Sequence, residues 1–304
     1  MKRSLFILFI LFGFLISVAV AQEKTILLTR TTEKSFTTGN NPEIIINAER
    51  GMINIKSWEK EEVKVRLKLI AKNRDVQKAR EELDYMHYSI SENLNSIYVN
   101  NRMRPEENDQ LISSIIRAEY EITVPKNIEI HLDNSFGKVQ VENIEGKLYG
   151  ELYYSDMVLS GYSGELDLQI FIGDFTSENS HLSGRLITKH SNILISRTGG
   201  KLHMETQYGN LQLIYGEKVL LLNVISNASD IIVNNPLCRT IKLRIAGAYC
   251  PLKNIDMCYT PEKEYYKFNY AKNQQERWML TYYPPEKASR LYISARFGTV
   301  SLCK

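Results

Sequence analysis

The sequence predicts an all-β protein: a single-domain β-solenoid in which each turn of the chain is a row of about 18 residues. Three observations support this prediction. Similar rows recur through the middle of the chain, apolar residues alternate within each row, and glycine returns at one place in each row. A segment with helical periodicity precedes the rows, and an irregular cysteine- and tyrosine-rich excursion interrupts them near the C-terminus.

The first residues have the order of a secretory signal peptide. Lys2 and Arg3 precede a long apolar run, and the run ends in small residues up to Ala21. This order predicts cleavage after Ala21, so residues 1–21 are assigned to a signal peptide and residues 22–304 to one exported domain. An uncleaved anchor is the alternative, because the run approaches the length that spans a bilayer. No later stretch reaches that length, so we expect no membrane span after cleavage and a soluble chain outside the cytoplasm.

The charges of the remaining chain are balanced. Without Lys2 and Arg3 the chain holds 36 basic and 35 acidic residues, a formal net charge of +1. A nucleic-acid surface needs clustered excess Lys and Arg, so we expect no nucleic-acid partner.

The rows emerge when the middle of the chain is aligned with itself. They start at Gly137, Asp156, Gly173, Asn192 and Gly209, with successive spacings of 19, 17, 19 and 17. One expected apolar column holds Val139, Val158, Phe175, Leu194 and Leu211. Two further columns hold Ile144, Tyr162, Leu182 and Thr198, and Leu148, Leu166, Leu186 and Leu202. The recurring glycines are Gly146, Gly164, Gly184 and Gly200.

Alternation on both sides of each glycine predicts a strand, a corner and a second strand in every row. Glycine suits a position with positive φ or a close backbone approach. Burial within one row contributes about 8 to 12 kcal/mol, whereas ordering the row costs about 27 kcal/mol. Single rows are therefore unstable, and stacked rows stabilise one another. An antiparallel sandwich with regular turns is the alternative.

The flanks extend this architecture. Core repeats are assigned to about residues 134–213, after a looser opening row at 50–69. Apolar spacing in "VQKAREELDYMHY" predicts a short capping helix near residues 75–88. The final "FGTVSL" predicts a terminal row at about 292–302, added last, whereas residues 214–291 do not show the repeat clearly.

The four cysteines all lie in the last quarter of the chain. They are Cys238, Cys250, Cys258 and Cys303. Export permits disulfides, an even count allows three pairings, and buried free thiols are the main alternative. No CxxC pair is present, and the five histidines show neither HxH nor HExxH spacing, so we expect no metal site and no cofactor.

Aromatic residues concentrate between residues 259 and 283. Tyr266, Phe268 and Tyr270 alternate, as do Trp278, Leu280 and Tyr282, which predicts a hairpin with one buried face. Tyr and Trp also dominate many binding surfaces. Candidate ligand-binding residues in this region are Tyr265, Trp278 and Tyr283.

Several of these segments together resemble the bacterial putative-adhesin domain family. The resemblance rests on "GMINIKSWEKEEVKV", on "YEITVPKN" leading into "NSFGKVQVENIEGKL", on the glycine-spaced rows, and on the terminal "FGTVSL". It covers most of residues 40–213 and the last row. It implies a β-solenoid from the bacterial envelope, of unknown biochemical function and with no established catalytic residues to carry over.

The predicted function is that of a non-enzymatic exported envelope protein, in the periplasm or at the surface of a bacterium. Its rigid scaffold would bind an envelope protein or a glycan. Two alternatives are a glycan-active β-solenoid enzyme and a self-associating structural or envelope-stress component. An enzyme of this kind needs converging carboxylates on adjoining rows. Glu165 and Asp167 could share a face, but the adjacent rows do not repeat them.

Overall fold

The computed structural model describes residues 25–105, 111–234, 241–255, 266–270, 277–282 and 289–303. The predicted signal peptide lies outside these residues. The all-β prediction is confirmed, because twenty strands join in one hydrogen-bonded sheet and a single helix, α2 (Val76–Asp84), lies among the described residues.

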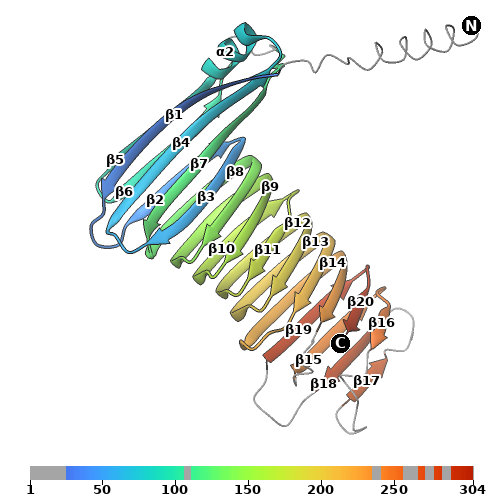
Figure 1. Ribbon diagram of the computed structural model, residues 1–304. Coiled ribbons are helices and arrows are strands. Elements are labelled where there is room, and N and C mark those ends of the chain that lie inside the picture. Colours follow the sequence, from blue (N-terminus) through green and yellow to red (C-terminus); the bar gives the residue numbers. More distant parts are fainter. Residues whose placement is uncertain are drawn as a thin grey trace, which may run out of the picture.

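The strands stack along an elongated molecule, with α2 at one end and the C-terminal strands at the other (Figure 1). The first nine are β1 (Ile26–Thr37), β2 (Glu43–Glu49), β3 (Gly51–Trp58), β4 (Glu62–Asn73), β5 (Met86–Asn93), β6 (Ser96–Met103), β7 (Ile115–Pro125), β8 (Asn127–Glu142) and β9 (Glu145–Ser160). The next six are β10 (Ser163–Phe171), β11 (Phe175–Glu178), β12 (His181–Ser196), β13 (Gly199–Ile214), β14 (Leu220–Asn234) and β15 (Ile241–Ala248). The last five are β16 (Leu252–Ile255), β17 (Tyr266–Tyr270), β18 (Arg277–Tyr282), β19 (Ser289–Arg296) and β20 (Val300–Cys303).

Long strands turn a corner and so belong to two parallel stacks. The first half of β8 pairs with β2 and its second half pairs with β3. In the same way β9 pairs with β10 before its corner and with β11 after it. A row consists of two strand segments, one from each stack. Apolar side chains from both stacks form one buried cluster along the molecule.

The register between central rows is constant, with each residue beside the one 18 positions later in the chain. Ser163 pairs with Glu145 on one side and with His181 on the other. The buried column of the second stack is therefore Val139, Met157, Phe175, Ile193 and Leu211. The predicted column was wrong at Val158 and Leu194, which alternate with these buried residues and lie on the other face. A slip of one residue turns a strand side chain to the opposite face, and apolar residues on both faces hide such a slip.

The same register corrects the other predicted columns. Gly146, Gly164 and Gly200 share one position, but Leu182 stands there in the row between them. Gly184 instead lies between Leu166 and Leu202 of the neighbouring rows. It therefore takes the place in that column that was predicted for Leu186. The predicted close approach is confirmed, because a Cβ at Gly164 would lie 1.8 Å from the carbonyl oxygen of Gly146.

At the first end of the molecule, the rows do not follow chain order. The row formed by β2 and β3 lies between the later strands β6 and β7 on one side and β8 on the other. Antiparallel strands β1 and β4 extend the second stack beyond β7, and β5 extends the first stack beyond β6. The outermost strands are tied together where the Lys34 ammonium donates to the Ile90 carbonyl at 2.6 Å.

The helix α2 packs beside these outer strands, against β1, β4 and β5 (Figure 1). Asp75 caps it by accepting hydrogen bonds from the backbone N–H groups of Gln77 and Lys78. The helix is shorter than predicted, because the alternating residues from Met86 onward form β5. Among the described residues, no helix has both the length and the apolar character needed to cross a membrane.

The C-terminal end repeats this out-of-order arrangement. The row of β19 and β20 was expected to be the last, but it lies between β14 and the row of β15 and β16. The segment predicted to be an irregular excursion thus begins with a regular row, which β15 and β16 form outside β19 and β20. The predicted hairpin is present as β17 and β18, in which Phe268 pairs with Leu280 and Tyr270 with Trp278.

Candidate functional site

One corner of the rows carries exposed, mostly aromatic residues, and we call it the aromatic corner. Its members in the central rows are Phe136, Tyr154, Ile172, His190 and Tyr208. All five have positive φ, from 52° at Tyr154 to 60° at Ile172. Phe136 and Tyr154 expose 56% and 53% of their surface. In the central rows the corner therefore places a ring in solvent at every turn but the one of Ile172, whereas the rows on either side carry Arg50 and Ala228 at this corner.

Neighbouring rings at this corner stack along the molecule. The ring centroids of Phe136 and Tyr154 are 5.0 Å apart, and those of His190 and Tyr208 are 4.8 Å apart. The outer C-terminal rows continue the pattern with Tyr249 and Phe297, at 5.6 Å. These separations follow from the spacing of hydrogen-bonded strands, about 4.8 Å. The rings thus stack in three separate pairs along the molecule, with Ile172 and Ala228 at the corner positions between them.

A small residue follows each member of the aromatic corner. In the central rows these residues alternate between glycine and serine: Gly137, Ser155, Gly173, Ser191 and Gly209. The rows approach so closely here that a Cβ at Gly137 would lie 1.9 Å from the carbonyl oxygen of Gly51. The similar "FG" pairs at Phe136 and Phe297 are thus explained by a left-handed corner residue before a close backbone contact.

The opposite corner of the rows has the same backbone conformation but different residues. It carries Asn143, Gly161, Asn179 and Arg197, with φ between 49° and 64°. Asn and Gly adopt this conformation at little cost, whereas it is unfavourable for bulky and β-branched residues. The backbone alone therefore does not require aromatic residues at a corner.

A hollow of about 410 Å³ lies beside the first ring of the aromatic corner. Its lining combines rings, amides and charged groups: Asn47, Ala48, Glu49, Asn101, Arg102, Asp133, Asn134, Ser135, Phe136, Glu151 and Tyr153. The Tyr153 hydroxyl donates to Glu151 Oε2 at 3.2 Å. Removal of the Tyr153 hydroxyl from water raises its pKa, and this hydrogen bond raises it further. The hollow thus offers hydrogen-bonding groups beside an exposed ring.

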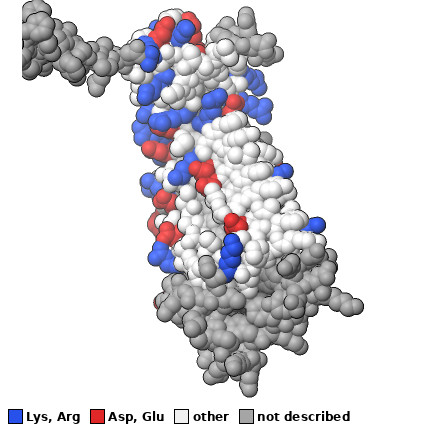
Figure 2. Space-filling view, turned by 90° about the vertical axis from the view of Figure 1, so that its right-hand side faces the viewer, with Lys and Arg blue, Asp and Glu red and all other residues white. Residues whose placement is uncertain are grey.

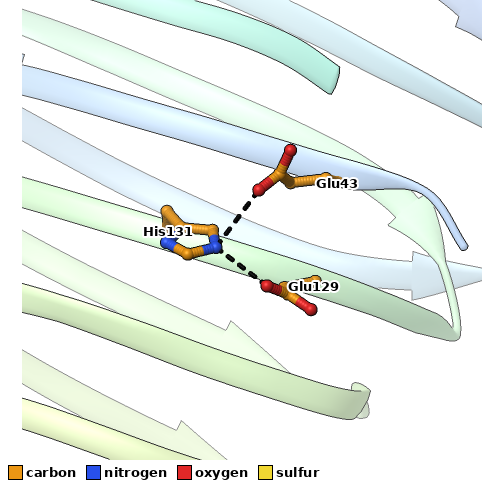
Figure 3. Close-up of side chains that lie close together, drawn as sticks. All are labelled: Glu43, Glu129 and His131. Carbon is orange, nitrogen blue, oxygen red and sulfur yellow. Dashed lines mark hydrogen bonds and ion pairs between the residues drawn. The ribbon is translucent and has the colours of Figure 1, made fainter. Parts of the chain in front are cut away.

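A second candidate site is a cluster of Glu43, Glu129 and His131 (Figure 3). Glu43 comes from β2, whereas Glu129 and His131 stand two residues apart on β8 and so face the same side. The Nε2 atom of His131 lies 3.2 Å from Glu43 Oε1 and 3.0 Å from Glu129 Oε1. The three groups are partly buried on the outer face of the first stack.

Further contacts hold the cluster in place. The Ser96 hydroxyl donates to Glu43 Oε2, and the Lys147 ammonium lies 3.2 Å from Glu129 Oε2. The His131 ring is 5.2 Å from the ring of Tyr149. The hydrogen bond with His131 lowers the pKa of Glu129, partial burial opposes this shift, and Lys147 adds to the lowering.

The ligand-binding residues predicted from the sequence are not tested by the structure. Tyr265 and Tyr283 lie outside the described residues, and Trp278 is placed only as a backbone position in β18. Cys238 and Cys258 also lie outside them, so the disulfide pairing stays a prediction. Cys250 is buried and Cys303 is half-buried, and burial raises the pKa of the Cys250 thiol to about 11.

Sequence reasoning missed both candidate sites. The aromatic corner could have been found from a strict 18-residue spacing of Phe136, Tyr154 and Tyr208, each before Gly or Ser. The cluster gave only a weak signal, the Glu-x-His pattern at residues 129–131, because Glu43 joins it from a row placed out of chain order. The structure brings His131 beside two carboxylates, which its spacing in the sequence did not predict, and the expectation of no metal site stays a prediction.

The surface between these features is uneven in charge. Figure 2 shows a broad area without charged side chains along the long axis, beside a band in which acidic and basic residues alternate. Between β8 and β14, one outward column of the second stack holds no charged residue: Gln140, Val158, Thr176, Leu194, Gln212 and Ile232. Uncharged, partly apolar surface of this kind is typical of contact surfaces.

Comparisons with known proteins gave structural similarities only. No family model matches the chain, and no curated protein matches it. A crystal structure of a putative adhesin from Bacteroides fragilis aligns with 8% identity and a TM-score of 0.46, over 90% of this chain and 97% of that chain. A putative cell adhesion protein from Clostridium sporogenes aligns with 13% identity and a TM-score of 0.29, over 91% and 99% of the two chains. A protein named as a putative lipid binding protein, from Parabacteroides distasonis, aligns with 10% identity and a TM-score of 0.31, over 67% and 89%. Solved structures similar to this chain over most of its length thus include proteins named putative adhesins.

Proposed function

We propose that this protein is an exported, non-enzymatic scaffold of the bacterial envelope, a β-solenoid that binds a glycan or an envelope protein along one edge. Export would follow removal of residues 1–21, and the site of action would be the periplasm or the cell surface. The observation that carries the proposal is the aromatic corner, where rings are exposed although the backbone does not need them.

Two physical arguments support a binding role for this corner. Residues held in unfavourable φ,ψ regions cost about 1–3 kcal/mol each and cluster at functional sites. Exposed rings also offer large contact area with little loss of side-chain entropy, so they contribute strongly to binding. Ring pairs that recur along the stack give a repeating contact surface, which suits a polymer with its own repeat.

The hollow beside Phe136 makes a glycan the first ligand class to test. Amide, carboxylate, guanidinium and phenol groups line it next to the ring. Hydroxyl-rich ligands need such paired donors and acceptors, together with an apolar surface for their C–H faces. A sugar chain seated in the hollow would continue along the aromatic corner.

The experiment is a binding assay of residues 22–304 against purified envelope and host polysaccharides. The test variant combines Phe136→Asn, Tyr154→Asn and Tyr208→Asn, which keep a residue suited to positive φ. Arg197→Asn at the opposite corner is the matched control. We expect the triple variant to stay folded and to lose at least tenfold in affinity, while the control keeps the affinity of the parent protein. Undiminished binding by the triple variant would exclude the aromatic corner as the contact surface. If the parent protein bound no polysaccharide, an envelope protein would become the preferred ligand.

A glycan-active enzyme is the second candidate, and a specific observation favours it. The carboxyl groups of Glu49, Asp133 and Glu151 line the same hollow, with Arg102 nearby. Two of them are already engaged by the backbone, since Met103 N–H donates to Glu49 and Glu151 N–H donates to Asp133. Chromatography of the polysaccharide after incubation separates the two functions. Shortened products that disappear in Glu151→Gln would establish the enzyme, whereas an unchanged polysaccharide supports the scaffold.

A further inference from the structure

We propose that Glu43, Glu129 and His131 form a binding site for one divalent transition metal ion, with Zn²⁺ the best match. This site is separate from the aromatic corner, and the proposal does not depend on what that corner binds. A nitrogen ligand and two carboxylate oxygens are a set that Zn²⁺ accepts readily, whereas Mg²⁺ and Ca²⁺ prefer oxygen alone.

The spacing of the ligand atoms fits one ion. His131 Nε2 is 3.2 Å from Glu43 Oε1 and 3.0 Å from Glu129 Oε1, and all the candidate ligand atoms lie within 4.8 Å of one another. Two ligands of a tetrahedral zinc ion, each at a bond length near 2.0 Å, lie about 3.3 Å apart. Binding therefore needs only small side-chain movements.

The backbone holds the ligands without help from the metal. Glu43 pairs directly with Glu129, and Ile45 pairs with His131, in neighbouring parallel strands. The oxygen of each carboxylate that faces away from His131 has its own partner, Ser96 for Glu43 and Lys147 for Glu129. Such outer contacts orient the first ligands in metal sites and tune the affinity.

Room for the remaining ligands lies next to the cluster. A hollow of about 460 Å³ is lined by both glutamates together with Asn41, Ser96 and Lys147. Three protein ligands plus water are the pattern of an open zinc site. The Lys147 ammonium adds positive charge nearby, so we expect weaker binding than in a closed four-ligand site.

Without metal, the same atoms form a hydrogen-bonded ion cluster. Carboxylates only accept hydrogen bonds, so the contact with Glu129 needs the tautomer of His131 in which Nε2 is the donor. Zinc would bind at that nitrogen: the proton of a neutral ring would move to Nδ1, and only a doubly protonated ring would release a proton to the solvent. The competing interpretation is therefore an ion cluster that never binds metal.

The chain supplies a matched control within the same stack. His203 occupies the position equivalent to His131 four rows later. Among the described residues it has one carboxylate partner, Glu205, whose Oε1 lies 3.4 Å from Nε2, and Arg185 binds that carboxylate at 2.7 Å. A surface histidine beside a single, engaged carboxylate should not hold zinc.

The test is calorimetric titration of metal-free residues 22–304 with ZnSO₄ and, separately, with MgCl₂. We expect one saturable zinc site and no magnesium site. His131→Ala and Glu129→Gln should each weaken zinc binding at least tenfold, and His203→Ala should leave it unchanged. If His131→Ala does not fold, Glu43→Gln provides the second variant.

Cobalt substitution distinguishes this site from cysteine ligation. Co²⁺ bound by nitrogen and oxygen shows visible bands without the intense sulfur-to-metal charge-transfer band that thiolates give. We expect the first spectrum, and its loss in Glu129→Gln. Failure of the parent protein to bind zinc, equal loss in His203→Ala, or a thiolate spectrum that persists in Glu129→Gln would each overturn the proposal.

Discussion

The two corners of each row share a backbone conformation but not a set of residues. At one corner, three of the four central residues, Asn143, Gly161 and Asn179, are suited to the left-handed region, and Arg197 is the exception. At the other, Phe136, Tyr154 and Tyr208 occupy the same region with exposed rings. The comparison shows that the stacked rows have a residue with positive φ at each corner, but that this residue need not be aromatic. Stacking requires a positive φ at both corners, so the choice of rings at one of them indicates a role outside folding.

The largest effect is expected where the aromatic corner meets the next row. Gly209→Ala would place a Cβ 1.9 Å from the carbonyl oxygen of Ser191, on a backbone with φ of +157°. Because that oxygen belongs to a hydrogen-bonded strand, the two rows must separate. We expect a loss of about 3 kcal/mol or more in the free energy of unfolding, measured by urea denaturation.

Gly161→Ala at the opposite corner is the control for this substitution. Its Cβ would first meet the side-chain oxygen of Asn143, which can move, and the strain is that of alanine at φ of +64°. That strain costs about 1–2 kcal/mol. Equal losses at the two positions would show that close backbone contact does not distinguish the corners.

A pair of exchanges tests whether the corner residues are chosen for stability. Ile172 and Asn179 are both exposed, with φ of 60° and 53°. Ile172→Asn should stabilise the protein by about 1 kcal/mol, and Asn179→Ile should destabilise it by about 1–2 kcal/mol. Thermal unfolding of both variants measures the two signs. A destabilising Ile172→Asn would mean that this side chain supports the fold, and the contrast between the corners would then lose its functional meaning.

The smallest effect on stability is expected at Glu82, which lies away from both corners and provides a reference for the corner variants. Glu82 of α2 is buried and accepts hydrogen bonds from the backbone N–H groups of Ser113 and Ser114 at 2.8 and 2.6 Å. Burial alone would raise the pKa of Glu82, but these hydrogen bonds prevail and lower it. A lowered pKa in the folded state stabilises the protein above the unfolded pKa and is lost as the pH falls through the folded pKa.

We therefore expect Glu82→Gln to cost about 1 kcal/mol at pH 7 and much less at pH 3. Urea denaturation at both pH values measures this difference. The corner exchanges at Ile172 and Asn179 should keep their effects at pH 3, because neither side chain titrates. An Ile172→Asn effect that vanished in acid would contradict the steric explanation.

Sequence reasoning predicted the central rows well, because their contacts recur at one fixed interval and the repeat is local. It placed Val158 and Leu194 in the core because apolar residues on both faces leave a one-residue slip undetected. Only backbone pairing resolves that slip, as Met157 beside Val139 shows.

The order of the rows at the two ends of the molecule escaped prediction for a different reason. The row of β2 and β3 pairs with β8, so Glu43 lies beside Glu129, 86 positions later in the chain. No periodicity within one sequence reports such a pairing. The cluster with His131 arises at this junction, which explains why the histidine spacing alone gave no sign of it. The shortened helix has a local cause, since Met86 fits both a helical face and the first buried position of β5.

The placement of β19 and β20 between two earlier rows has a consequence for how the chain reaches its final state. Until residues 289–303 arrive, β14 and β15 each present an open edge toward a vacant slot one strand wide. Residues 289–303 must therefore insert between two strands that precede them in the chain. Synthesis from the N-terminus can therefore complete every central turn early, whereas the far end stays incomplete until β19 and β20 have been made.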